Sequence, residues 1–256
     1  MTKPGKRFIN SGGVFFSMHK ANEKFKVWGD VFDNFAIVTI EKLIDKNCFD
    51  ELESPISVGK EANVFSAKRG SDRVAVKIYR LETCDFNRMY DYIRADPRYI
   101  GMKKRRRQVI LSWCQREYRN LMKAREAGLS APYPIAFLNN ILVSEYIGDE
   151  NPAPKLKDEI PEVLSAFAVE VFTQVRKFYK AGYVHSDLSE FNILNFNEKP
   201  IFIDFSQATT DRNPNFSEYL ERDIRNMCHF FRKKGLAIEE EKITAYIKGG
   251  KEKLIL

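Results

Sequence analysis

Residues 184–205 read VHSDLSEFNILNFNEKPIFIDF, and this stretch decides the interpretation of the whole chain. Four residues separate Asp187 from Asn192, and Asp204 follows the apolar residues 201–203. Phosphoryl transfer needs hard oxygen ligands for magnesium and a carboxylate that orients or deprotonates the attacking hydroxyl. Asp187, Asn192 and Asp204 offer such groups in a loop and after a short strand, so they are the candidates for this chemistry.

A cap or a turn would explain any one of these residues, because Asp and Asn favour both. The catalytic loops of kinases, however, combine an aspartate, four residues and an asparagine with a second aspartate after a downstream strand. The chain reproduces both elements in this order. The combination favours a site for phosphoryl transfer over three unrelated turns.

A lysine interrupts an apolar strand upstream of this loop. Residues 74–79 read VAVKIY, so Lys77 stands in a run that is predicted to be largely buried. A buried ammonium is costly without an anionic partner, which ATP phosphates or a helix carboxylate can supply. Glu117 on the following helix is the best candidate for that carboxylate; a solvent-facing role for Glu117 is the alternative, since Glu126 shares the helix.

The turn before this strand, residues 57–64, contains a single glycine, Gly59. The GxGxxG fingerprint of many nucleotide-binding loops is absent. Ser57 and Lys60 remain as groups that could face phosphates. An ordinary hairpin explains the turn when it is taken alone, whereas its position ahead of Lys77 favours a nucleotide-facing turn.

Hydrophobic periodicity predicts a sheet-rich first half and a helical second half. Strands are expected at 56–58, 62–67, 74–79, 135–138, 141–146, 193–196 and 201–203, and helices at 34–44, 111–127, 162–181, 217–234 and 239–247. Residues 151–154 (NPAP) are typical of a linker. We therefore expect an α+β, bilobal fold in which an N-terminal antiparallel sheet with one main helix faces a mostly helical lobe across a cleft.

Three parts follow from this division. Residues 1–50 are expected to form an N-terminal helical extension, 51–147 the sheet lobe that binds nucleotide, and 148–256 the lobe with the catalytic loop and metal site. Residues 81–110 are interpreted as an insertion in the sheet lobe. Its Asp96-Pro97 pair and Gly101 break helical continuity, so we expect a long, partly mobile loop.

Composition excludes several classes of protein. The chain has 256 residues, with 42 Lys and Arg against 35 Asp and Glu, and its 44% hydrophobic content indicates a globular protein. No apolar run approaches the roughly 20 residues of a membrane span, and residues 14–16 are too short for a secretory signal. Four dispersed cysteines without a CxxC pair suit a reducing compartment, so we expect a cytoplasmic protein.

Much of the positive charge lies in the insertion. Residues 80–107 contain nine basic and four acidic residues, and residues 103–107 read KKRRR. A solubilising loop is one explanation for this run. Binding to the phosphate backbone of RNA is the other, without base-specific readout, because the run itself contains no aromatic residue.

Together these segments resemble the RIO family of atypical protein kinases, in particular its Rio-one subfamily. The matching segments are ISVGKEANVF (56–65), AVKIYRLETCDF (75–86), EYRNL (117–121), VHSDLSEFN (184–192), IDFSQA (203–208) and YLERDIRNMCHFF (219–231). The similarity covers about residues 50–234. Two positions depart from the family pattern: Val58 replaces the usual Thr, which removes a hydroxyl near the phosphates, and Ser186 replaces the usual Ala.

The resemblance implies a reduced two-lobed protein-kinase fold that binds ATP and Mg²⁺ or Mn²⁺. It implies that Asp187 is the catalytic base, that Asn192 and Asp204 hold the metal, and that Asp204 accepts phosphate as a transient aspartyl-phosphate. Lys77 would hold the α- and β-phosphates. Backbone groups of Glu145 and Ile147 would bind the adenine.

The resemblance also implies an autophosphorylating serine/threonine kinase and ATPase that acts in maturation of the small ribosomal subunit. The basic insertion would then contact ribosomal RNA, and a monomer is favoured. Only about a dozen residues lie between Asp204 and the helix expected at 217, and no Ala-Pro-Glu follows. A long activation segment that presents peptide substrates is therefore missing.

Two other functions stay open. A small-molecule phosphotransferase of the aminoglycoside or choline kinase type would share Asp187, Asn192 and Asp204, but it normally needs a larger helical lobe. A non-catalytic RNA-binding assembly factor would explain the basic run. It would not explain why Lys77 accompanies the three polar residues.

Overall fold

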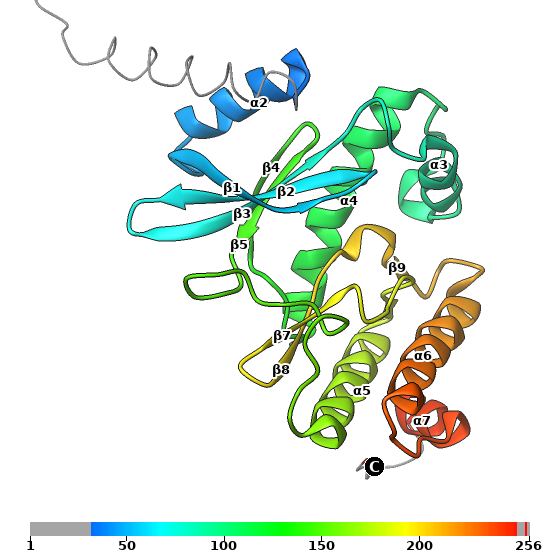
Figure 1. Cartoon of the computed structure of the whole chain (residues 1–256). Helices are drawn as coiled ribbons and strands as arrows, with labels where there is room; N and C mark the ends of the chain where they lie inside the picture. Colours follow the sequence, from blue (N-terminus) through cyan, green and yellow to red (C-terminus); the bar gives the residue numbers. More distant parts are fainter. Residues whose placement is uncertain (1–31, 250–253, 255–256) are drawn as a thin grey trace, which may run out of the picture.

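The structure, a computed structural model, describes residues 32–249 and 254, which form a sheet lobe and a helical lobe (Figure 1). The sheet lobe contains α2 (Asn34–Asp45), β1 (Glu51–Val58), β2 (Ala62–Arg69), β3 (Asp72–Tyr79), α3 (Phe86–Arg94), η1 (Pro97–Tyr99), α4 (Arg106–Glu126), β4 (Pro134–Leu138) and β5 (Ile141–Glu145). The helical lobe contains α5 (Leu164–Lys180), β6 (Tyr183–Val184), β7 (Ile193–Phe196), β8 (Lys199–Phe202), η2 (Phe205–Gln207), β9 (Thr209–Thr210), α6 (Phe216–Lys233) and α7 (Glu240–Ile247). The expected α+β architecture is confirmed.

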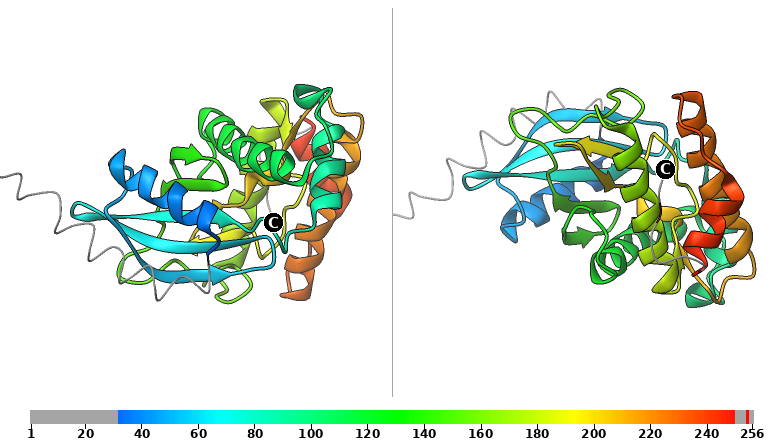
Figure 2. Two further views of the ribbon diagram at one scale, coloured as in Figure 1. Left: turned by 90° about the horizontal axis from the view of Figure 1, so that it is seen from above. Right: turned by 90° about the horizontal axis from the view of Figure 1, so that it is seen from below.

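The five strands of the sheet lobe form one antiparallel sheet in the order β1-β2-β3-β5-β4. Side chains of the central strand β3 alternate, so that Val74, Val76 and Ile78 are buried on one face and Lys77 lies on the other. Helix α2 covers the first face, where Ile40 joins the same apolar cluster (Figure 2). The lysine is thereby left on the face that meets α4 and the helical lobe.

Helix α2 begins where the sequence predicted. The side chain of Asp33 accepts a hydrogen bond from the amide of Ala36 at 2.7 Å and caps the first turn. The remainder of the expected N-terminal extension, residues 1–31, lies outside the described residues.

The basic insertion differs from the expected loop. Its first part forms α3, which Asp85 caps by accepting from the amide of Arg88 at 3.1 Å, and whose Met89 and Ile93 pack into a cluster with α4. Pro97 then starts the short helix η1. Apolar residues do recur at helical spacing here (Phe86, Met89, Tyr90 and Ile93), but the breakers Asp96-Pro97 and Gly101 follow directly, and the whole segment was therefore interpreted as a loop.

Helix α4 starts at Arg106, five residues before the expected start at Leu111. The run 103–107 is therefore split between an irregular segment and the first turn of a helix. Basic residues in a first turn are unfavourable for the helix dipole, which is why the sequence did not predict a helix start here. The C-terminal end of α4 matches the predicted end at residue 127, and Gly128 follows the last turn in the left-handed region (φ 78°).

The two lobes share a core. Leu121 and Ala124, near the end of α4, belong to the apolar cluster that α5, α6 and α7 build in the helical lobe. The β7–β8 hairpin turns at Asn197 and Glu198, both with positive φ, so β8 begins two residues earlier than the predicted strand 201–203. The end of α4 thus anchors the sheet lobe to the helical lobe.

No helix in residues 32–249 is long and apolar enough to cross a bilayer. The boundaries that the sequence suggested for the three parts of the chain stay predictions.

Candidate active site

A cleft of about 660 Å³ lies between the lobes. It is bounded by the β1–β2 turn, the strands β3 and β5, the segment after β5, and the β7–β8 hairpin with Asp204. The predicted site residues that line it are Ser57, Gly59, Lys60, Lys77, Glu117, Glu145, Ile147, Asn192 and Asp204. Asp187 is not among the lining residues, but its neighbour in the same loop, Asn192, is.

Lys77 joins the two lobes at the back of this cleft. Its Nζ lies 2.8 Å from Oε1 of Glu117 on α4 and 3.0 Å from Oδ1 of Asp204 in the helical lobe. The Tyr79 hydroxyl donates to the other carboxylate oxygen of Glu117. Glu126, the alternative partner, pairs instead with Lys123 on the exposed side of α4.

The two carboxylates keep Lys77 charged although its side chain is only 16% exposed. Burial alone would lower the pKa of Lys77, but Asp204 and Glu117 raise it above its ordinary value. Burial would likewise raise the pKa of Asp204, and Lys77 with the hydroxyl of Ser206, which donates at 2.7 Å, instead lowers it to about 2. The cleft therefore contains a fixed ammonium beside an ionised carboxylate.

Two residues of this site have left-handed backbone conformations. Asp204 (φ 61°) and Ser186 (φ 67°) both adopt the left-handed region, which L residues other than Asn and Asp rarely enter. Such conformations persist only when the surroundings determine them. Both residues are indeed held by neighbours from other elements, as the contacts below show.

Asn192 and Asp187 are in contact with each other. The Asn192 amide nitrogen donates to the Asp187 carbonyl at 2.8 Å and to its carboxylate at 3.4 Å, so the amide oxygen of Asn192 is the atom left for a ligand. Asp187 Oδ1 lies 4.0 Å from the guanidinium of Arg88 on α3. Burial and the nearby Asp204 raise the pKa of Asp187 to about 6, against the opposing effect of Arg88 and Arg222.

The donor set fits magnesium. An amide oxygen and an ionised carboxylate, from Asn192 and Asp204, line the same cleft. Within residues 32–249 and 254, no group of three or more His, Cys, Asp or Glu side chains could hold a metal. Magnesium bound through one or two protein oxygens together with substrate phosphates matches this arrangement.

Asp223, to which the sequence motifs gave no role, holds the loop that carries Asp187. This buried carboxylate on α6 accepts from the amides of Ser186 at 2.8 Å and Leu188 at 2.9 Å. Burial raises the pKa of Asp223 to about 7, although these two amides and Arg222 oppose the shift. The neighbouring Arg222 donates to the Ser186 carbonyl and to the Tyr92 hydroxyl. Segment 219–231 also contains Glu221 and Arg225, so its sequence pattern does not single out Asp223.

His185 ties the same loop to the strand before Asp204. Its Nε2 lies 3.0 Å from the carbonyl oxygen of Ile203, and its ring packs on Phe205 with centroids 4.9 Å apart. Burial lowers the pKa of His185 to about 4, so the ring is neutral at pH 7. Its contacts assign His185 a role in positioning the loop.

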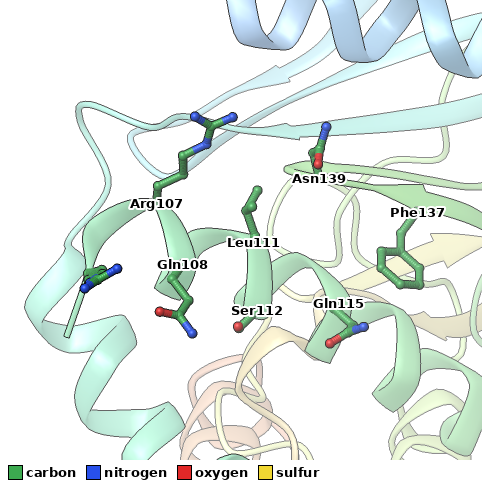
Figure 3. Close-up of a pocket in the computed structure, with 8 residues that line it drawn as sticks. Arg107, Gln108, Leu111, Ser112, Gln115, Phe137 and Asn139 are labelled. Carbon is green, nitrogen blue, oxygen red and sulfur yellow. The ribbon is translucent and has the colours of Figure 1, made fainter. Parts of the chain in front are cut away.

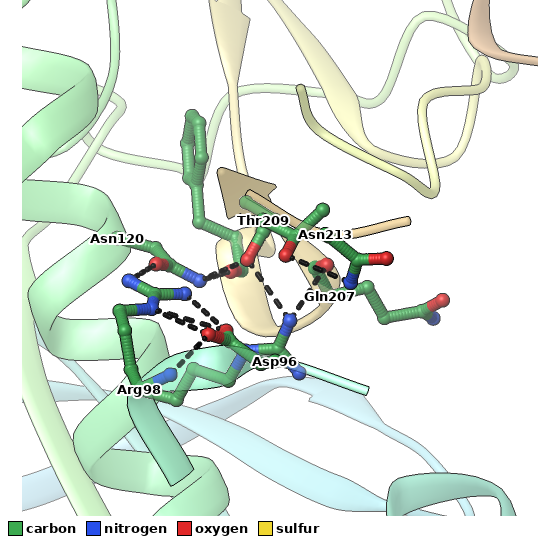
Figure 4. Close-up of polar contacts among 9 residues, drawn as sticks. Asp96, Arg98, Asn120, Gln207, Thr209 and Asn213 are labelled. Carbon is green, nitrogen blue, oxygen red and sulfur yellow. Dashed lines mark hydrogen bonds and ion pairs between the residues drawn. The ribbon is translucent and has the colours of Figure 1, made fainter. Parts of the chain in front are cut away.

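A buried polar network holds the segment after Asp204 from the other side (Figure 4). Arg116 on α4 donates to the carbonyls of Gln207 at 3.2 Å and Ala208 at 3.1 Å. Asn120, one turn later, donates to the carbonyls of Phe205 at 2.8 Å and Ala208 at 2.7 Å. The same helix that carries Glu117 therefore fixes the backbone that follows Asp204.

The insertion completes this network. The Asp96 carboxylate is fully buried and lies 3.5 Å from Nε of Arg116 and 2.6 Å from the guanidinium of Arg98. Arg98 also donates to the amide oxygen of Asn120 at 3.0 Å. Arg116 is fully buried, and burial lowers its pKa to about 10, so the guanidinium stays charged at pH 7 and depends on Asp96.

Comparisons with known proteins agree with this geometry. A profile of the RIO domain matches residues 63–243. The chain is 38% identical to a RIO-type serine/threonine-protein kinase Rio1 of Haloferax volcanii, over 90% of this chain and 80% of that protein. It is 41% identical to the Rio1 of Thermoplasma acidophilum, over 72% of this chain and 98% of that protein.

Among solved structures, the fold resembles that of Rio2 kinase from Chaetomium thermophilum, crystallised as an ADP/Mg²⁺-phosphoaspartate complex. The TM-score is 0.62 at 20% identity, over 85% of this chain and 67% of that chain. At this identity the likeness establishes the fold.

The network predicts a large effect of Asp96→Ala on stability. Removing the carboxylate leaves the buried charge of Arg116 without a counterion, which costs about 3–5 kcal/mol of unfolding free energy. Urea unfolding measures this loss. The control is Asp91→Ala on the exposed side of α3, which should stay within about 0.5 kcal/mol of the wild type. A loss below about 1 kcal/mol for Asp96→Ala would show that Arg116 does not depend on it.

Proposed function

Because the chain belongs to the RIO family of protein kinases, we propose that it binds ATP with magnesium in the cleft between its lobes and transfers or hydrolyses the γ-phosphoryl group. The observation that supports this most strongly is the position of Lys77 between Glu117 and Asp204. Kinases use a strand lysine, a helix glutamate and a metal-holding aspartate in these roles.

The segment after β5 is proposed to hold the adenine. The amide of Glu145 already donates to the carbonyl of Tyr133 at 2.8 Å. We therefore assign the N–H donor for the base to Ile147 and the acceptor to the carbonyl of Glu145. Ser57, Gly59 and Lys60 in the β1–β2 turn lie at the cleft wall, where they would contact the phosphates.

Lys77 is proposed to bind the α- and β-phosphates, and Asn192 and Asp204 to hold the metal. Magnesium bound there would neutralise charge on the phosphates. In the free protein Lys77 contacts Asp204 directly. On binding, this ion pair would be replaced by one between Lys77 and the phosphates and one between Asp204 and the metal. The low pKa of Asp204 keeps it ionised for this purpose over the whole physiological range.

Asp187 is proposed as the base. With a pKa raised to about 6 it is mostly ionised at neutral pH, yet basic enough to accept a proton from the attacking hydroxyl. The attacking hydroxyl belongs to a serine, a threonine or water. Helix α6 starts at Phe216, so only a short segment follows Asp204, and this favours hydrolysis or autophosphorylation over binding of extended peptide substrates.

Asp204 is further proposed to form an aspartyl-phosphate, as the name of the Rio2 complex indicates for that protein. A carboxylate oxygen would attack the γ-phosphorus, and ADP would leave with the electron pair of the broken bond. Water, losing its proton to Asp187, would then release inorganic phosphate and restore the carboxylate.

Finally, we propose that the protein acts in maturation of the small ribosomal subunit, in the cytoplasm, and binds ribosomal RNA through the basic segment. Lys103, Lys104 and Arg105 are exposed. Arg106 instead donates to the carbonyls of Leu81 and Glu82, at 3.2 and 2.8 Å, and so has a structural role. All four cysteines are free thiols, which suits a reducing compartment.

Asp187→Ala should leave ATP affinity within a few-fold but reduce turnover by roughly 10²–10⁴, the usual scale for loss of a positioned acid–base group. ATP is held by other residues, and Asp187 acts in the transition state. Calorimetric ATP binding paired with phosphate release tests this. Glu190→Ala, in the same loop, should keep both values, and near-normal turnover of Asp187→Ala would remove the assignment.

The aspartyl-phosphate predicts a labelled intermediate with distinct chemistry. After acid quenching of a reaction with γ-labelled ATP, hydroxylamine should release the label from the wild type, because acyl phosphates react with it and phosphoserine does not. Asp204→Asn should show no such label. If all protein-bound label resists hydroxylamine, Asp204 does not accept the phosphoryl group.

The RNA contact predicts a change in salt dependence. Replacing Lys103, Lys104 and Arg105 by Gln should make the slope of log affinity for ribosomal RNA against log salt shallower by about 2–3, because each contacting cation contributes roughly −0.7 to −0.9. ATP affinity should not change. Filter binding over a salt series measures the slope, and an unchanged slope would identify the segment as a solubilising loop.

A further inference from the structure

A second hollow, of about 510 Å³, lies outside the cleft on the sheet lobe (Figure 3). One wall is the outer face of α4, and the other is the edge strand β4 with the turn that follows it. We call this hollow the α4–β4 groove. It is open to solvent, and no part of the proposed catalysis uses it.

The groove contains three amide side chains. Gln108 and Gln115 lie two turns apart on α4, and Asn139 lies in the turn after β4. Among the described residues, neither glutamine side chain has a hydrogen-bond partner within the chain. The Asn139 amide nitrogen donates to the Thr39 hydroxyl at 3.0 Å, which leaves its oxygen available. Side-chain amides carry both donors and acceptors and are well suited to the polar edges of nucleobases.

The groove also contains an aromatic ring. Phe137 on β4 lies in the wall opposite Leu111 and is partly buried. Tyr118 packs against it with ring centroids 4.9 Å apart and holds it in place. A fixed ring beside unpaired amides is the combination with which proteins stack and read unpaired bases.

One end of the groove is strongly positive. Arg105 and Arg107 line it, and no carboxylate does. The Arg107 guanidinium stacks on the ring of Phe35, 3.9 Å from its centroid, and is thereby held at the rim. The first turn of α4 has no acidic residue, and its N-cap residue Arg105 makes no side-chain cap, so its free amides add to the positive potential.

We propose that the α4–β4 groove binds an unpaired nucleotide of single-stranded RNA. The base stacks on Phe137 and pairs with the amides, and the adjoining phosphates lie on Arg105 and Arg107. A duplex does not fit, because its base faces are already stacked and its major groove is too narrow for side chains. This inference rests on the proposed RNA role of the basic segment and adds a site for bases to it.

The test compares a short unstructured RNA with an RNA duplex of the same length, using fluorescence anisotropy and the full-length protein. Phe137→Leu keeps an apolar side chain in the wall but removes the aromatic stacking surface. It should weaken single-strand binding by about 5- to 150-fold, the effect of losing one stacked base, and leave duplex binding unchanged. Tyr133→Leu, at an exposed aromatic residue outside the groove, should change neither.

A second variant does not depend on packing. Gln108 is exposed, so Gln108→Glu adds a negative charge to the groove without disturbing the core. It should also weaken single-strand binding more than duplex binding, and unchanged ATP affinity would show that both variants are folded. AMP and poly-glutamate are then added as competitors of the labelled single-stranded RNA, to represent a free nucleotide and an acidic peptide. If either one displaces the RNA at concentrations similar to those of unlabelled RNA, the assignment to single-stranded RNA is overturned.

The two proposals fail in different ways. If the wild type binds neither RNA in a salt-dependent manner, the proposed RNA role fails and the groove assignment fails with it. If the Lys103, Lys104 and Arg105 variant loses salt dependence but Phe137→Leu and Gln108→Glu bind both RNAs like the wild type, only the groove assignment is wrong.

Discussion

The charge of Lys77 is the constraint on which the rest of the site depends. An ammonium in the central strand of a sheet must have counterions, and this protein takes them from two other elements, Glu117 on α4 and Asp204 in the helical lobe. This requires α4 to lie on the sheet face opposite α2, and it requires the helical lobe to bring Asp204 across the cleft. Arg116 and Asn120 on the same helix donate hydrogen bonds to the backbone carbonyls that follow Asp204, so α4 positions both counterions.

The site keeps two carboxylates close together and two residues in left-handed conformations, and contacts from other elements hold them there. Asp187 and Asp204 raise the electrostatic cost of each other's charge, and Ser186 and Asp204 adopt left-handed conformations. Asp223 accepts from two loop amides, and the buried pair of Asp96 and Arg116 closes the other side. Such an arrangement is preorganised for a cation and a polyanion, since both would relieve the repulsion when they bind. The groups that hold it, Asp223, Asp96 and Arg116, are not among those proposed to touch the substrate.

The sequence predicted the features that arise from local patterns. The hairpins, the Asp33 cap and the Gly128 stop follow from residue types a few positions apart, and RIO membership follows from short motifs. The pairing of Lys77 with Glu117, which lies 40 residues later and beyond α3, was predicted instead from the need of a buried ammonium for an anionic partner. Helix α3 was missed although its residues are amphipathic, because the breakers Asp96-Pro97 and Gly101 that follow it favoured a loop. The early start of α4 was missed because its first turn lies in a charged run. Asp223 and Asp96 were missed because tertiary packing decides whether an acid is buried. The α4–β4 groove joins exposed and half-buried residues of separate elements, which no local pattern marks. The catalytic and binding roles themselves stay predictions.

A crystal structure with a non-hydrolysable ATP analogue and Mg²⁺ would test the central claim most directly, namely that the cleft around Lys77 is a phosphoryl-transfer site. The account predicts the adenine at Ile147 and the α- and β-phosphates on Lys77. It also predicts a metal about 2.0–2.1 Å from oxygens of Asn192 and Asp204. The contact between Lys77 and Asp204 should lengthen as phosphate and metal replace it, while Glu117 stays on Lys77. A nucleotide bound elsewhere, or a metal that contacts neither Asn192 nor Asp204, would contradict the account.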